Sequence, residues 1–327
     1  MRSIRRILVA LKEPGAKSLP IVAKAVQLAR GFNACLELFH CIDDPIYSDI
    51  AALPQRGFQV IEQDWRAGFL QRLESIAVPL RRLGLAVSTS VEWDFPVYEA
   101  IVRRARDIGS DLIVSECYRG RHIVPSLLHL TDWELLQVSP LPVLLVKNTS
   151  RWNRPVILAA VDPSHAFAKS ADLDAEILSA STAIREALLG SLHVVHGWVP
   201  PPLGAAKVKS LDASTVKRVT KQALAQVQQQ FDRVLRTTDI PRSRRHLIER
   251  HAIDAIQDVA RDTHSSIVVM GAVSRSGLKR IFIGNTAQRL LDALPCDILV
   301  VKPRQFRARV SRNARGARLR AAQSFNL

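Results

Sequence analysis

Short apolar runs alternate with amphipathic segments along most of the chain. The runs at 7–11, 112–114 and 143–146 contain only aliphatic residues. Between them, residues 22–29 and 101–108 place apolar side chains three or four positions apart, which predicts helices. Short buried strands separated by helices are typical of a parallel sheet with helices on both faces. The pattern therefore predicts an α/β, doubly wound fold.

The same pattern occurs twice in the chain. The segment Ile7–Lys12, ILVALK, corresponds to Ile157–Asp162, ILAAVD, which lies 150 residues later. The segment PVLLVK at 142–147 corresponds to DILVVK at 297–302, which lies 155 residues later. Self-similarity at a nearly constant offset indicates that one structural unit is duplicated.

The repeat predicts two tandem domains, at 1–148 and 153–303, joined by a polar, turn-rich segment. We expect each domain to be a five-stranded parallel sheet with helices on both faces. The apolar last strands, 143–146 and 298–301, are candidates for pairing the two domains within one molecule.

Charge is concentrated at the C-terminal end. The formal net charge is +16, and the last 26 residues contain eight basic and no acidic residues. A basic tail can bind nucleic acid or an anionic surface. The alternative is that residues 304–327 form a disordered tail that only keeps the protein in solution, and disorder is the prediction here.

The remaining composition favours a cytoplasmic protein. The apolar run at 7–11 is too short for a secretory signal, and no run approaches the roughly 20 apolar residues that span a bilayer. The four cysteines have no metal-type spacing, which fits buried thiols in a reducing compartment. His193 and His196 resemble a metal pair, but on a strand they face opposite sides. We therefore predict no metal site.

Two loops of the second domain are expected to meet at the carboxyl ends of its strands, where ligands bind in such sheets. One loop begins with Asp162, and the other is the stretch 271–286, GAVSRSGLKRIFIGNT, which leads into a helix. Gly271 and Gly284 permit close backbone approach, and Asn285 and Thr286 offer donors beside a helix N-terminus, as phosphate sites do. The alternatives are that Asp162 caps a turn and that the glycines serve only tight turns.

The spacing resembles that of the universal stress protein family: glycine, two residues, glycine, nine residues, then glycine and a small polar residue. Gly271 and Gly284 match the first and third glycines, Asn285 matches the polar residue, and Ser274 replaces the middle glycine. The likeness covers both domains and is closest to tandem, E-type members. It implies an adenine-nucleotide α-hydrolase-like fold that binds ATP, with Mg²⁺. The implied nucleotide-binding residues are Asp162, Gly271, Ser274, Gly284, Asn285 and Thr286.

The first domain departs from this pattern. Lys12 stands in place of the aspartate, Glu116 stands near the phosphate position, and Leu130 replaces the last glycine. We predict that this copy is structural or binds something other than a nucleotide. Arg103 and Arg104 are interpreted as part of a solvated helix face.

The resemblance implies a non-catalytic stress-response protein that binds an adenine nucleotide in its second domain. One alternative is a module for an apolar or lipid-like ligand, with Trp65, Phe69 and Trp93 in the first domain as the contact residues. Another is a weak ATPase, for which the sequence identifies no catalytic residue.

Overall fold

The computed structural model describes residues 3–44, 46–47, 55–116, 131–163, 172–200, 213–271, 293–307, 310–316 and 319–320. It divides into two compact units, each described by itself. The second unit is Asn153–Gln305, and the first unit comprises the residues up to Trp152 together with the segment from Phe306 onward.

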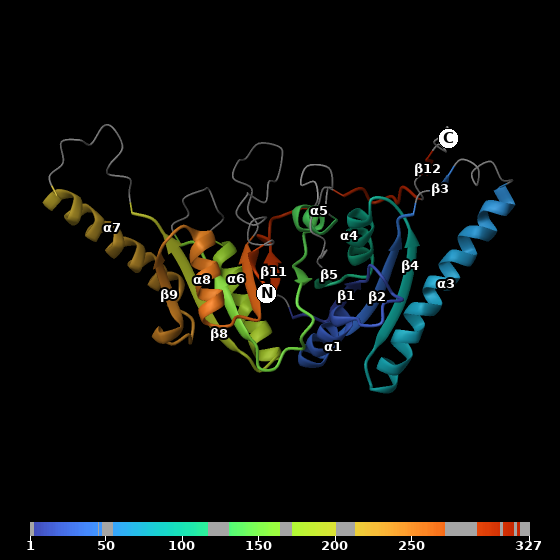
Figure 1. Cartoon of the computed structure of the whole chain (residues 1–327), viewed down its shortest axis with the longest axis horizontal. Helices are drawn as coiled ribbons and strands as arrows, with labels where there is room; N and C mark the ends of the chain where they lie inside the picture. Colours follow the sequence, from blue (N-terminus) through green and yellow to red (C-terminus); the bar gives the residue numbers. More distant parts are fainter. Residues whose placement is uncertain are drawn as a thin grey trace, which may run out of the picture. The chain divides into compact units, whose positions relative to one another are not determined.

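The first unit is a parallel sheet with the strand order β4-β2-β1-β5-β6 (Figure 1). Its strands are β1 (Arg6–Ala10), β2 (Cys35–Ile42), β4 (Val87–Trp93), β5 (Leu112–Glu116) and β6 (Val143–Val146). Its helices are α1 (Pro20–Phe32), α3 (Gln55–Arg82), α4 (Val97–Asp107) and α5 (Thr131–Val138). A short strand, β3 (Ile46–Tyr47), pairs in parallel with β12 (Leu319–Arg320) near the C-terminus.

The second unit repeats this topology with the order β11-β10-β7-β8-β9. Its strands are β7 (Val156–Ala160), β8 (Ser191–Trp198), β9 (Arg245–Glu249), β10 (Ile267–Gly271) and β11 (Asp297–Val301). Its helices are α6 (Asp172–Ala187), α7 (Ala213–Val234) and α8 (Ala252–Asp262), with a 3₁₀ turn, η1 (Arg242–Arg244).

The core of each unit is built by its central strands. Ile7, Leu8 and Val9 in β1 are completely buried, and Val268 and Val269 in β10 are too. In each unit the chain adds strands first on one side of the central strand and then on the other. Right-handed crossovers between these parallel strands place helices on both faces of the sheet. The predicted doubly wound α/β fold in two copies is confirmed. The pairing of the two domains through their last strands stays a prediction.

The C-terminal segment differs from the sequence prediction. Residues 310–316 lie against the first unit, where Val310 is buried and the backbone of Arg315 and Gly316 donates to Asp94. The predicted disorder therefore does not hold for the parts of this segment that the structure describes. The reason is that the first unit buries carboxylates that accept hydrogen bonds from a positively charged segment.

Among the described helices, none has the length and apolar character that a membrane span requires.

We predict that Gly197→Ala lowers the free energy of unfolding by about 1–3 kcal/mol, the usual cost of overpacking. A Cβ atom at Gly197, in β8, would lie 2.9 Å from the Cα of Ala252 and from the Cβ of Ala255 in α8. Urea unfolding measures the change. Gly68→Ala is the control, since a Cβ atom there meets nothing within 4 Å and a helical alanine should stabilise by up to about 1 kcal/mol. Equal effects would contradict the close approach of α8 to β8.

Candidate functional site

The candidate site of the second unit lies where β7 and β10 run side by side. These strands pair in parallel, with Met270 opposite Ala160. The chain continues from β7 to β8 on one side and from β10 to β11 on the other, so their carboxyl ends form the topological switch point. Asp162 lies two residues beyond the end of β7, and Gly271 ends β10. The structure thus brings these two predicted site residues together.

The other predicted site residues lie outside the described part of the chain. These are Ser274, Gly284, Asn285 and Thr286. The described site therefore consists of the start of each loop and the elements that hold it.

Three hydrogen bonds fix the chain as it leaves β7. The backbone N–H of Val161 donates to the carbonyl of Val195 at 3.1 Å, and that of Asp162 donates to Oδ1 of Asp174 at 3.0 Å. The ring Nδ1 of His196 lies 3.1 Å from the carbonyl oxygen of Val161. Asp162 is partly buried, and its backbone is held from two sides, by β8 and by α6. Such fixation is what a recognition carboxylate needs, because its geometry is set before a ligand arrives.

Gly271 is required by packing. A Cβ atom at this position would lie 2.6 Å from Cδ2 and 2.8 Å from Cγ of Leu173, which is completely buried in α6. The absence of a side chain therefore lets α6 begin close against the end of β10. Sequence reasoning identified the glycine but not Leu173, because Leu173 lies 98 positions earlier and carries no local signal.

The first unit has charged side chains at the equivalent place. β1 and β5 pair as β7 and β10 do, which puts Lys12 and Glu116 at the positions of Asp162 and Gly271. Nζ of Lys12 lies 2.8 Å from Oδ1 of Asp132, a carboxylate that is 6% exposed. Burial raises the pKa of Glu116, an effect that the backbone N–H and the charge of Lys12 partly offset. This place in the first unit therefore carries an ion pair and a partly buried carboxyl group, unlike the equivalent place in the second unit.

A histidine supports the same loop in both units. His40 in β2 places its Nδ1 2.9 Å from the carbonyl oxygen of Leu11, as His196 does with Val161 in the second unit. Each histidine thus holds the residue just before Lys12 or Asp162. Burial lowers the pKa of His40, which favours the neutral ring. The two histidines occupy equivalent positions of the repeat, 156 residues apart.

His193 faces away from this site. Its Nδ1 lies 3.0 Å from Nε2 of His246 on the neighbouring strand β9, and the two rings are stacked with centroids 5.3 Å apart. His193 and His196 therefore do not converge, as the strand geometry predicts. Among the described residues, no group of three or more metal-ligating side chains occurs.

The aromatic residues of the first unit do come together. The rings of Trp65 and Trp93 are stacked with centroids 5.4 Å apart, and Phe69 packs against the cluster of Ile42 and Trp93. Trp93 is 7% exposed and Trp65 is 44% exposed. The inner part of this cluster is core, and only its outer edge is available to a ligand.

Comparison with known proteins identifies the family. The model of the universal stress protein family matches residues 3–147 and again residues 154–302. The chain belongs to the universal stress protein family. Universal stress protein E of Escherichia coli K12 is 25% identical over 321 residues, covering 95% of this chain and 98% of that protein. The predicted tandem, E-type membership is thereby confirmed, and with it a role in stress response.

Solved structures agree with the fold. A functionally unknown protein from Pseudomonas aeruginosa PAO1 superimposes with a TM-score of 0.71 at 25% identity, covering 92% of this chain and 94% of that one. A universal stress protein from Archaeoglobus fulgidus gives a TM-score of 0.56 at 13% identity, covering 92% of this chain and 99% of that one, which supports the fold alone.

We predict that the second unit loses stability as the pH falls below about 6.5 because of His193 and His246. Burial lowers the pKa of each below the ordinary histidine value of 6.5, so the unfolded chain takes up protons first. Their contribution is complete above pH 6.5 and is lost on acidification. His193→Gln should flatten the fall in the urea midpoint between about pH 7.5 and pH 5.

His251→Gln is the control, because His251 is exposed and should leave the fall unchanged. If His193→Gln and the wild-type protein show parallel pH profiles, the histidine pair does not set the pH dependence.

Proposed function

We propose that this universal stress protein binds an adenine nucleotide in its second unit, at the carboxyl ends of β7 and β10, and acts in the stress response without catalysis. The observation that carries the proposal is the position of Asp162 beside Gly271 at the switch point of that sheet. Ligands of doubly wound sheets bind at this place.

Asp162 is assigned to the nucleoside. A partly buried carboxylate at this point can accept hydrogen bonds from a ribose hydroxyl or an adenine amino group. Its backbone is already held by Asp174 and, through Val161, by His196, so its ordering cost on binding is small.

The phosphates are assigned to the loop that leaves β10. Gly271 presents backbone without a side chain, and the loop residues Ser274, Gly284, Asn285 and Thr286 supply backbone and hydroxyl or amide donors in this proposal. Mg²⁺ would accompany the phosphates of ATP. The proposal assigns Asp162 to recognition and names no general base, and for this reason it is one of binding and not of hydrolysis.

The first unit supports the assignment by contrast. Lys12 is engaged with Asp132, and Glu116 lies at the position that Gly271 has in the second unit. A triphosphate would meet both carboxylates there. One nucleotide per chain is therefore expected.

We predict that Asp162→Ala weakens ATP binding by about 1–3 kcal/mol, the cost of leaving a buried polar partner unmatched. Lys12→Ala, at the equivalent position of the first unit, should change ATP binding little. Titration calorimetry with Mg²⁺ and ATP measures both. Equal losses from the two substitutions would refute the assignment to the second unit. No heat from any form, wild-type included, would favour the apolar-ligand alternative at Trp65 and Trp93.

We also predict that His196 acts as a positioning residue for Asp162. His196→Phe keeps the ring beside Phe231 but removes the hydrogen bond to the Val161 carbonyl, so ATP affinity should fall by about 1 kcal/mol, roughly fivefold. His193→Phe is the matched control on the same strand, because His193 contacts His246 instead. The same loss in both variants, measured by calorimetry, would show a general effect of β8 and not of positioning.

A further inference from the structure

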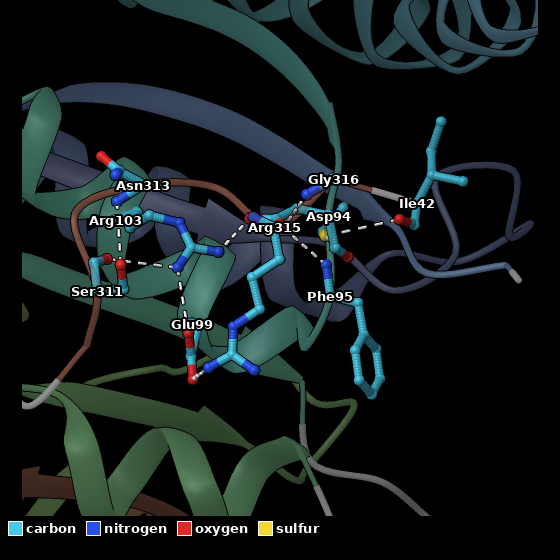
Figure 2. Close-up of polar contacts among 10 residues, drawn as sticks. Ile42, Asp94, Phe95, Glu99, Arg103, Ser311, Asn313, Arg315 and Gly316 are labelled. Atoms are coloured by element: carbon cyan, nitrogen blue, oxygen red, sulfur yellow. Dashed lines mark hydrogen bonds and ion pairs between the residues drawn. The ribbon is translucent and has the colours of Figure 1, made fainter. Parts of the chain in front are cut away.

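A buried acid pair in the first unit receives the C-terminal segment (Figure 2). Asp94, which directly follows β4, is completely buried, and Glu99 in the first turn of α4 is 7% exposed. Arg103, one turn further along α4, forms ion pairs with both carboxylates and is itself 4% exposed. The prediction that Arg103 belongs to a solvated face is wrong, because these carboxylates draw it inside.

The carboxylate of Asp94 is bound by backbone as well as by side chain. The N–H groups of Arg315 and Gly316 both donate to its Oδ1, at 2.9 Å and 3.0 Å. Two successive N–H groups that converge on one oxygen are the arrangement by which turns bind anions. Gly316 has φ of +74°, a left-handed conformation that side chains disfavour, and a Cβ atom there would meet nothing within 4 Å. Glycine is thus needed for its backbone and not for lack of space.

Contacts on either side give this segment a defined register. Nη2 of Arg315 lies 2.7 Å from Oε1 of Glu99, and Nη1 of Arg103 donates to the carbonyl of Ser311 at 3.4 Å. Val310 is 8% exposed. Beyond the turn, Leu319 and Arg320 add to β3 as a parallel strand.

These contacts of the C-terminal segment are typical of a peptide-recognition site. It has a guanidinium bound by a carboxylate, a pair of backbone amides on a buried anion, and strand addition at a short edge. The contacts are specific in register, yet Arg315 remains 57% exposed, so the segment is held at its surface and not built into the core.

We propose that the first unit contains a docking site for a basic, glycine-containing peptide, formed by Asp94, Glu99, Arg103 and the edge of β3. Its occupant is the chain's own C-terminal segment, residues 310–316 and 319–320, here named the strap, which docks reversibly. Because the strap is tethered, its effective concentration at the site is of the order of millimolar, and it excludes competing peptides. Release of the strap opens the site and frees a basic arm.

The test uses the full chain and hydrogen exchange followed by mass spectrometry. Gly316→Ala strains the turn by roughly 1–2 kcal/mol, so the amides of residues 315 and 316 should exchange about five- to thirtyfold faster. Glu99→Gln, which weakens a different contact, should raise exchange at the same amides by up to about fivefold. Arg312→Ala is the matched control, since Arg312 lies in the strap with an exposed side chain, and should leave exchange unchanged.

A synthetic peptide of residues 306–320, labelled for fluorescence anisotropy, tests the site itself. It should bind full-length Gly316→Ala about five- to thirtyfold more tightly than wild-type protein, in which the tethered strap occupies the site. The double variant Gly316→Ala, Glu99→Gln should lose this gain, as should a peptide that carries Gly316→Ala. Equal peptide binding to wild-type protein and all variants would indicate unspecific attraction and overturn the proposal. Unchanged exchange in Gly316→Ala would also overturn it.

Discussion

In both units, the parallel pairing of the first strand with the fourth determines where chemistry can occur. β7 lies beside β10, and β1 lies beside β5. The chain leaves each pair in opposite directions across the sheet, so two loops start next to each other with no helix between them. Asp162 and Gly271 are neighbours for this reason alone, although 109 positions separate them.

The same skeleton supports different electrostatics in the two units. In the second unit, Leu173 packs against Gly271, which has no side chain. The backbone of Asp162 is held there by a hydrogen bond. In the first, Lys12, Asp132 and Glu116 place positive and negative charge at the equivalent position. In both units a histidine contacts the backbone of the first loop. This indicates that the fold sets the position of the loop, whereas the residues around the loop determine which ligand it accepts.

The strap contacts a third place at the carboxyl end of a strand. Asp94 follows β4 and so lies at a strand's carboxyl end, like Asp162 in the other unit. Besides Arg103 and the N–H of Phe95, its partners are two backbone N–H groups more than 200 positions away. A buried carboxylate must be matched by donors, and in this unit the chain's own C-terminal segment supplies them.

The sequence by itself determined the duplicated α/β architecture, the family and the two loops of the candidate site. Apolar periodicity is local, and a 150-residue repeat shows the same pattern twice, so both can be read along the chain. The sequence also indicated that the first copy carries Lys12 where the second carries Asp162. Only the tertiary structure decided that Arg103 is buried, that Leu173 requires Gly271, and that a segment predicted to be disordered docks on Asp94 and Glu99. Those features depend on contacts between residues far apart in the chain, where burial changes the free energy of a charge and no local pattern records the partner.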